Sequence, residues 1–298
     1  MKTWRLRLNP RSPWATPWRA DSLFGAICWR WRELFPESFE SFLEEFRAAG
    51  EPPFILSDAF PGDLLPLPIH IELPQGKKDK PKPPRYLPET SFRNLMQTGM
   101  PANPEVIGNV IQDSSRVQTA IDRNLGSAAL GQLFETDTQH FQRGEDFLSI
   151  FIRSDGRIDQ VLACLRALVW TGFGKKSSTG LGAFEILGEP EACDWLDQVP
   201  GANAFVALSH FVPSHTDPAD GCWQVHVTYP KFHANSVSNV FKGGILMLTP
   251  GSAFRVKNGS LRPWYGRTIP VPRPEMPKAL HYGLCLSAPL VWREDDKA

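Results

Sequence analysis

Residues 170–184 bring together the residue types that bind an anion. The segment holds four glycines, two lysines and three hydroxyl residues, which are Gly172, Gly174, Gly180, Gly182, Lys175, Lys176, Ser177, Ser178 and Thr179. Glycine lets the backbone come close to a ligand, and successive free amide groups form a concave site for an anion. The two lysines add countercharge. The segment therefore predicts contacts with a phosphate chain.

The order of elements around this loop does not match the common nucleotide-binding motifs. A P-loop or a dinucleotide-binding loop leads from a strand into a helix, with its glycines at fixed spacing. Here an apolar helical pattern precedes the loop and an apolar strand pattern follows it. A nucleotide cradle at a helix N-terminus is thus not expected. The alternative interpretation is an ordinary glycine-rich turn between a helix and a strand.

Length and composition predict a globular protein of two domains. The chain has 298 residues, of which 42% are hydrophobic and 21% charged. It contains no apolar run long enough to span a membrane, and its first residues alternate in polarity, so we expect a soluble cytoplasmic protein without membrane contact. Five cysteines lie far apart without a Cys-x-x-Cys pair, which argues against a zinc site or a disulfide framework. We expect no metal and no cofactor.

Charge is segregated along the chain, although the formal net charge is +0. Residues 1–32 carry seven basic residues against one acid, and residues 33–72 carry nine acids against one base. Residues 241–278 again hold seven basic residues against one acid. Such clustering suits a polyanion on one face and a basic partner on another. Ordinary solvated charged faces are the alternative.

The periodicity of residues 1–190 predicts a ferredoxin-like domain in an α+β protein. Asp21 is expected to cap the first helix. Strands are expected at 2–8, 54–60, 147–152 and 181–187, and helices at 21–35, 36–46 and 159–170. Apart from the extra helix at 36–46, the order is strand, helix, strand, strand, helix, strand. This is the order of the ferredoxin-like fold, whose open sheet often binds RNA.

A long insertion, at about residues 61–146, interrupts this domain. It begins with a Pro/Lys-rich tract at 74–88, expected to form a mobile arm, and continues with a polar span at 112–124. A second, β-rich domain is expected at residues 200–298. Its strands are expected at 204–211, 223–228, 244–248, 253–256 and 282–287. We interpret it as a degenerate copy of the first domain.

The sequence resembles the RAMP (repeat-associated mysterious protein) superfamily of CRISPR effectors. Residues 20–29 (ADSLFGAICW), residues 121–126 (IDRNLG) with 131–134 (GQLF), and the glycine-rich loop carry this resemblance. Within the superfamily the chain is similar to the subunit of the type III-A (Csm) interference complex that holds the 5′ end of the guide RNA. That similarity lies in residues 53–61, 85–99, 241–248 and 251–254.

The resemblance implies two ferredoxin-like, RRM-like RAMP domains and a non-catalytic, RNA-binding role in a type III CRISPR interference complex. Such a subunit binds the repeat-derived 5′ handle of the guide RNA (crRNA). It also bridges the large polymerase-like subunit and the backbone RAMP subunits. An inserted hairpin, the thumb, wedges between guide and target RNA, and residues 75–125 lie where it would emerge.

The loop is the first expected RNA contact. Lys175 and Lys176 would neutralise handle phosphates while the backbone around Gly174 and Gly180 approaches the RNA. The hydroxyl groups of residues 177–179 would donate to phosphate or 2′-OH groups.

Two further pairs of residues are candidates for RNA contacts. Arg116 and Arg123, in the insertion, suit backbone contacts or stacking on a splayed base, with a plain surface role as the alternative. Ser22 and Gly25 would let RNA approach the N-terminus of the first helix. Helix capping and close helix packing are the alternative for that pair.

Other functions remain open from the residues alone. A metal-independent endoribonuclease that processes CRISPR precursor RNA would use a histidine as general base, with His210, His215 and His233 as candidates. A metal-dependent nuclease would need a carboxylate beside the thumb, for which Asp113 and Asp122 are candidates. A scaffold that binds protein partners and little RNA is the third possibility.

Overall fold

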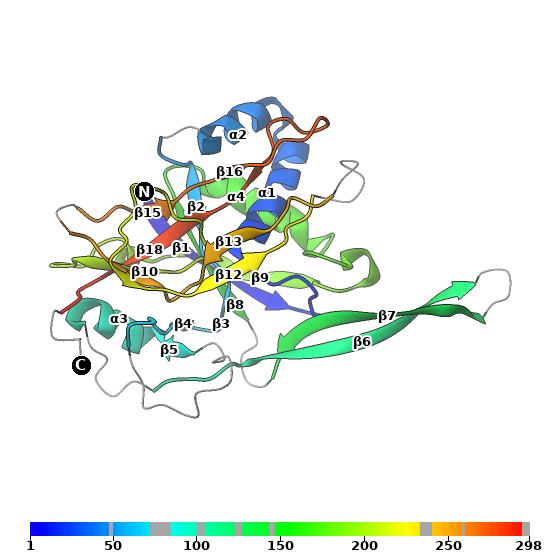
Figure 1. Ribbon diagram of the computed structural model, residues 1–298, viewed down its shortest axis with the longest axis horizontal. Coiled ribbons are helices and arrows are strands. Elements are labelled where there is room, and N and C mark those ends of the chain that lie inside the picture. The colour runs from blue at the N-terminus through cyan, green and yellow to red at the C-terminus, as the bar shows by residue number, and fades with distance from the viewer. Residues whose placement is uncertain are drawn as a thin grey trace.

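The computed structural model describes residues 1–47, 50–71, 85–99, 105–122, 127–142, 147–232, 240–257 and 260–293. It shows a body of sheets and helices from which one long hairpin projects (Figure 1). Helices α1, α2 and α4 lie together on one side of the body, and α3 lies on the other (Figure 1). Within these residues no helix is long and apolar enough to cross a membrane.

The first sheet has the ferredoxin-like topology that the sequence predicts. It contains β1 (Lys2–Pro10), β2 (Phe54–Leu56), β8 (Leu148–Ser154) and β9 (Phe184–Ala192), in the order β2-β8-β1-β9. Every pairing in it is antiparallel. The short strand β3 (Phe60–Pro61) also pairs with β8. The fold class is therefore confirmed.

Two amphipathic helices connect these strands. In α1 (Ala20–Leu34) the buried residues Leu23, Phe24, Ile27 and Trp31 recur at helical spacing, and α1 packs against α4 (Ile158–Val169). The prediction that Asp21 caps α1 is wrong, because Arg19 occupies the N-cap position. The carboxylate of Asp58, far along the chain, instead accepts the Ala20 N–H at 2.9 Å.

A one-turn helix and α2 extend this layer. The 3₁₀ helix η1 (Pro36–Ser38) leads into α2 (Phe39–Arg47), which buries Phe42, Leu43 and Phe46 as predicted. On its outer face Glu40 and Glu44 lie 2.8 and 3.3 Å from the ammonium group of Lys278. Part of the acidic run is thus neutralised within the molecule, by a residue of the basic run near the C-terminus.

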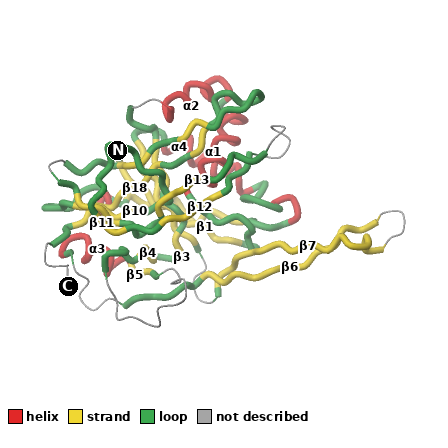
Figure 2. The backbone as a smooth tube through the Cα atoms, viewed as in Figure 1, coloured by secondary structure: helices red, strands yellow, loops and turns green. Residues whose placement is uncertain are grey.

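The insertion contains more regular structure than the sequence predicts. Its strands β4 (Leu64–Pro66) and β5 (Tyr86–Pro88) pair, and α3 (Glu89–Thr98) follows. The long strands β6 (Ile111–Asp122) and β7 (Ser127–Phe141) then form the projecting hairpin (Figure 2). The thumb-like insertion is therefore a hairpin of residues 111–141, later in the chain than the expected 75–125. Most of the Pro/Lys-rich tract lies outside the described residues.

The C-terminal part is built of strands, as predicted. A second five-stranded sheet has the order β11-β14-β10-β18-β15. Its strands are β10 (Ala204–Ala207), β11 (Gly221–Cys222), β14 (Ala253–Arg255), β15 (Trp264–Gly266) and β18 (Leu284–Leu290). Two smaller pairs accompany it, β12 (Val225–Thr228) with β13 (Ile245–Leu248) and β16 (Ile269–Pro270) with β17 (Leu280–His281). The 3₁₀ helix η3 (Asp194–Leu196) lies between the two parts of the chain.

One hydrophobic core runs through both sheets. Buried residues of β1, β8 and α1 belong to the same cluster as buried residues of β10 and β18. Polar links reinforce it, since the Leu56 N–H donates to the Tyr282 hydroxyl at 2.8 Å. The buried guanidinium of Arg153 donates to the carbonyl of Ser287 at 3.0 Å and to that of Leu196 at 2.7 Å. The two sheets thus support each other.

Candidate nucleic-acid interface

The glycine-rich loop joins α4 to β9 and contains the 3₁₀ helix η2 (Ser177–Thr179). All four of its glycines have positive φ. At Gly182 a Cβ atom would lie 2.0 Å from the Phe173 carbonyl oxygen, and at Gly174 it would lie 2.5 Å from the Thr16 side chain. Gly180, in contrast, has nothing within 4 Å of that position. Gly180 is the glycine with room for a ligand, whereas Gly174 and Gly182 are needed for internal packing.

The loop keeps three successive amide groups free. Most of its other amides are occupied within the protein, as when Lys175 N–H donates to the Thr16 hydroxyl at 2.8 Å and Gly182 N–H donates to the Pro13 carbonyl at 2.9 Å. Across the described residues, the amides of Lys176, Ser177 and Ser178 have no acceptor from the protein. Three adjacent free N–H groups are the arrangement that binds a phosphate oxygen.

Some side chains of the loop are exposed, and others make contacts within the protein. The side chains of Lys175 and Ser178 are exposed. The Thr179 hydroxyl donates to the Lys176 carbonyl at 2.9 Å and so helps to hold the loop. The Lys176 ammonium lies 4.5 Å from the ring centroid of Phe134 on β7. Lys175 and Ser178 are therefore the freest side chains for an RNA contact, and Lys176 lies between the loop and the hairpin.

Residues 11–19 join the loop to both α1 and the hairpin. Trp18 stacks on Phe173 of the loop, with ring centroids 4.1 Å apart, just before α1 begins. Trp14 exchanges two backbone hydrogen bonds with Gln139 of β7, at 3.0 and 2.8 Å, and its indole N–H donates to the Gln139 side chain. The structure thus brings three predicted regions together: the loop, the start of α1 and the base of the hairpin.

Ser22 and Gly25 lie in the first turns of α1. A Cβ atom at Gly25 would meet nothing within 4 Å, so close helix packing does not explain this glycine. The Ser22 side chain is partly exposed. The surface at these two residues is open to a ligand.

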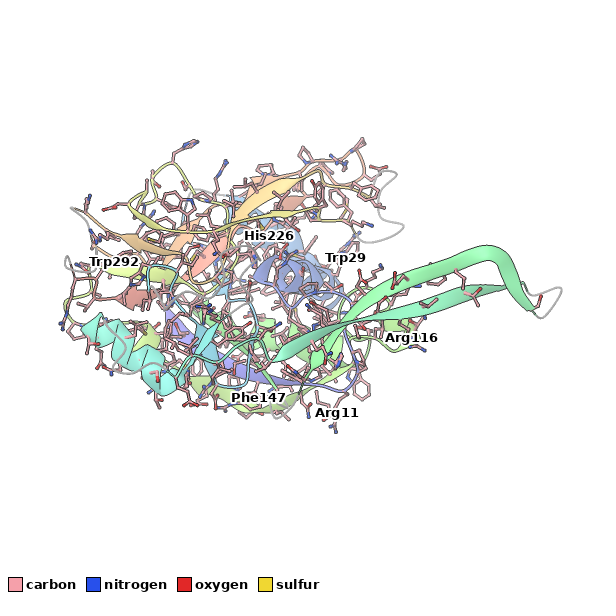
Figure 3. All side chains as sticks on the ribbon, turned by 60° about the horizontal axis from the view of Figure 1, so that its bottom comes forward. Arg11, Trp29, Arg116, Phe147, His226 and Trp292 are labelled. Atoms are coloured by element: carbon pink, nitrogen blue, oxygen red, sulfur yellow. The ribbon has the colours of Figure 1, made fainter. Side chains whose placement is uncertain are left out.

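The hairpin carries Arg116 about halfway along β6 (Figure 3). The register pairs Arg116 with Thr136 and Gln118 with Phe134, so Arg116 and Phe134 are diagonal neighbours on one side of the hairpin. The Thr136 side chain on this side is buried, and the Arg116 side chain is exposed. Because Lys176 contacts Phe134, the loop and Arg116 lie along the same side. Arg123 lies outside the described residues.

The histidine candidates do not converge. His210 donates through Nδ1 to the buried carboxylate of Asp58 at 2.5 Å, whereas His215 is exposed and His233 lies outside the described residues. The neighbour of His210 is His226, with ring centroids 5.2 Å apart, a residue that sequence reasoning missed. His226 lies on the short strand β12, whose sequence gives no sign of this contact.

The charges of His210, Asp58 and His226 interact with residues at the start of α1. Burial by itself would raise the pKa of Asp58, but His210, the Ala20 amide and Arg19 outweigh it and lower that pKa below its ordinary value. Burial, followed by the charges of Arg19 and His210, lowers the pKa of His226. Arg19 donates to His226 Nε2 at 2.7 Å. This polar cluster connects the start of α1, the loop after β2, the segment after β10 and strand β12.

The carboxylates considered for a metal-dependent nuclease are not grouped. Asp113 accepts a hydrogen bond from the Gln139 amide at 2.9 Å, and the side chain of Asp122 lies outside the described set. Over the described ranges, no cluster of three or more histidine, cysteine or acidic side chains is arranged to hold a metal ion.

Sequence reasoning also missed three residues that shape this surface. Thr16 packs against Gly174, Phe134 contacts Lys176, and Trp170, at the start of the loop, is 91% exposed. Trp170 completes an apolar helical pattern, which favours burial. Its position beyond the end of α4 leaves it outside the core instead.

Comparison with known proteins gives matches in structure only. No protein-family model and no curated protein matches the sequence. A chain of the crystal structure of the Csm1-Csm4 cassette in complex with cA4 superposes with a TM-score of 0.61 and 18% identity, covering 98% of this chain and 99% of that one. The cassette in complex with pppApA gives a TM-score of 0.58 at 18% identity, with the same coverage.

A different assembly gives a similar result. A chain of the crystal structure of the Csm3-Csm4 subcomplex in the type III-A CRISPR-Cas interference complex has a TM-score of 0.58 and 14% identity. The superposition covers 97% of this chain and 99% of that one. The chain therefore has the fold of these proteins over nearly its whole length.

Proposed function

We propose that this chain is a non-catalytic, RNA-binding subunit of a type III CRISPR interference complex that holds the 5′ handle of the guide RNA. The observation that carries the proposal is the glycine-rich loop, where three free amides and Lys175 lie beside the start of α1 and the base of the hairpin. Amides and lysines bind a phosphate backbone without regard to base sequence. Such a site suits a handle that every guide shares.

The structural neighbours support a place between two protein partners. One set of matched structures contains Csm1 with Csm4, and the other contains Csm3 with Csm4. Csm4 is the component common to both. We propose that this chain occupies the Csm4 position, with the large polymerase-like subunit on one side and a backbone subunit on the other, in a cytoplasmic assembly.

The projecting hairpin suits a contact with the paired RNA. It leaves the body as two long strands, and Arg116 lies on its exposed middle part (Figure 3). Arginine binds phosphates and stacks on splayed bases. In this proposal the hairpin is the thumb that meets guide and target RNA, while the loop holds the handle.

Replacing both loop lysines tests the handle site. Lys175→Ala with Lys176→Ala should weaken retention of the guide without moving its 5′ end. Each lost phosphate contact flattens the dependence of log affinity on log salt by about 0.7 on a single strand, so the double variant should lose at least about 0.7 of that slope through the exposed Lys175. The measurement is fluorescence anisotropy with the guide RNA that co-purifies with the chain, resynthesised and titrated at several salt concentrations.

Lys257→Ala provides the matched control. Lys257 is an exposed lysine that follows β14 and pairs with Asp220 at 2.8 Å, and it belongs to neither the loop, α1 nor the hairpin. Its replacement removes one positive charge and should leave the salt slope unchanged. Equal guide affinity and equal slope in the wild type and the loop variant would refute the handle site.

A further inference from the structure

Lys176 has an unusual backbone for a lysine. Its φ of 65° lies in the left-handed region, and no other non-glycine residue in the described part of the chain has a positive φ. Glycine would adopt this conformation at lower energetic cost. The presence of a lysine here therefore suggests that its side chain has a role.

The loop fixes the direction in which this side chain leaves the backbone. The Lys176 carbonyl accepts hydrogen bonds from the amides of Thr179 at 3.0 Å and Leu181 at 3.3 Å, and from the Thr179 hydroxyl at 2.9 Å. These three bonds hold the backbone of Lys176 in place. The ammonium group is thereby presented to Phe134, whose ring centroid lies 4.5 Å away.

Phe134 is a defined point of contact on the hairpin. It is 40% exposed and lies on the same side of β7 as Thr136 and Thr138, which are buried. On the opposite side Leu133 is 74% exposed. The contact with Lys176 is formed beyond the Trp14–Gln139 bridge, toward the hairpin tip, so it opposes rotation of the hairpin about its base.

We propose that Lys176 is a positioning residue that uses the ring of Phe134 to hold the hairpin beside the glycine-rich loop. In this position Arg116, the diagonal neighbour of Phe134, lies along the same side as the free amides of the loop. One RNA strand then contacts the loop and the hairpin together. This last step rests on the function proposed above, whereas the contact itself does not.

The first test needs no RNA. Spin labels are introduced as non-natural amino acids at Leu133 and at Glu189, an exposed residue of β9, and the distance distribution between them is measured on the full chain. The wild type and Phe134→Tyr, which keep an aromatic ring, should give a narrow distribution. Phe134→Leu and Lys176→Gly should give a broad one. Equal widths in all four proteins would overturn the proposal.

Two comparisons separate positioning from damage to the fold. Lys176→Gly relieves the left-handed backbone, so its free energy of unfolding should not fall although its distance distribution broadens. Phe241→Leu removes another exposed ring that lies under a lysine, with Lys231 4.7 Å from the centroid, and should leave the distribution narrow. Broadening in Phe241→Leu would show a general effect of ring loss and would contradict the specific contact.

The second test uses the co-purified guide RNA. Phe134→Leu removes no charge, yet it should flatten the salt slope of binding by about 0.7, because Arg116 loses its phosphate contact. In an Arg116→Gln background the same replacement should have no further effect. An unchanged slope in Phe134→Leu, together with a broad distance distribution, would refute the RNA step and leave the positioning contact standing.

Discussion

Two buried imidazoles should make the stability of this protein sensitive to acid. Burial, followed by the charge of Arg255, lowers the pKa of His70 to about 4. Burial is also the main cause that lowers the pKa of His281 to about 4. Both side chains contain buried ring nitrogens without a hydrogen-bond partner within the described part of the chain. They are therefore neutral in the folded protein at neutral pH.

Because the unfolded imidazole titrates near 6.5, the unfolded state binds more protons than the folded state between about pH 6.5 and 4. Stability from each of these histidines is present above that window and is lost as pH falls through it. His70 stacks on Trp292 with centroids 4.1 Å apart, and His70→Phe keeps a ring there without a titrating group. The variant should lose about 1–2 kcal/mol less than the wild type between pH 7 and pH 5.

Urea unfolding at the two pH values measures this difference. The exposed residue His215 provides the control, since His215→Gln should follow the wild type. Parallel losses in wild type and His70→Phe would show that folding does not lower the pKa of His70.

At this scale the sequence predicted residue types better than residue partners. Composition and resemblance were enough to select candidate RNA contacts such as the loop lysines, Ser22 and Gly25, because lysines and glycines can be recognised from the sequence alone. The Asp58 cap of α1 could not, since Asp58 and Ala20 meet only when β2 and α1 pack. The contact of His210 with His226 likewise forms only when distant parts of the chain pack together.

At the scale of elements, glycines with the same backbone conformation have different surroundings. Gly182 lies in the glycine-rich loop, and Gly188 lies in β9. Gly182 and Gly188 have nearly the same φ, 67° and 66°, but an added Cβ would meet the Phe173 carbonyl at Gly182 and open space at Gly188. Gly182→Ala should therefore lower the free energy of unfolding by about 3 kcal/mol or more, and Gly188→Ala by about 1–2 kcal/mol.

Gly180→Ala extends this comparison to the ligand site. Gly180 also has open space around it, so its replacement should cost as little stability as that of Gly188. Urea unfolding of the three variants ranks their losses in the free energy of unfolding. A cost at Gly182 no larger than at Gly188 would contradict the close packing of the loop.

The helices and the first sheet were predictable because their apolar residues repeat at helical or alternate spacing. The hairpin was not recognised as such, since β6 and β7 carry mostly polar side chains on both sides. Its buried positions Thr136 and Thr138 are themselves polar, so burial produces no alternation of apolar and polar residues in the sequence. Resemblance predicted an inserted hairpin, and the structure gave its bounds, residues 111–141.

For the whole molecule, the sequence predicted two sheets but not their shared core. The cluster that contains Leu6 and Ile150 of the first sheet also contains Val206 and Leu286 of the second. Such contacts connect residues far apart in the chain and have no local pattern. One continuous body thus supports the loop, the start of α1 and the base of the hairpin, which keeps the candidate surface in a fixed geometry.

The RNA that accompanies the intact protein tests the central proposal most directly. The chain is tagged in its native host and purified gently, and the bound RNA is sequenced with its 5′ ends mapped. The proposal predicts guide RNAs that share one repeat-derived 5′ end, together with the large subunit and a backbone subunit. Random RNA, or no RNA, would contradict handle binding, and unprocessed precursor cut by the purified chain would favour the endoribonuclease instead.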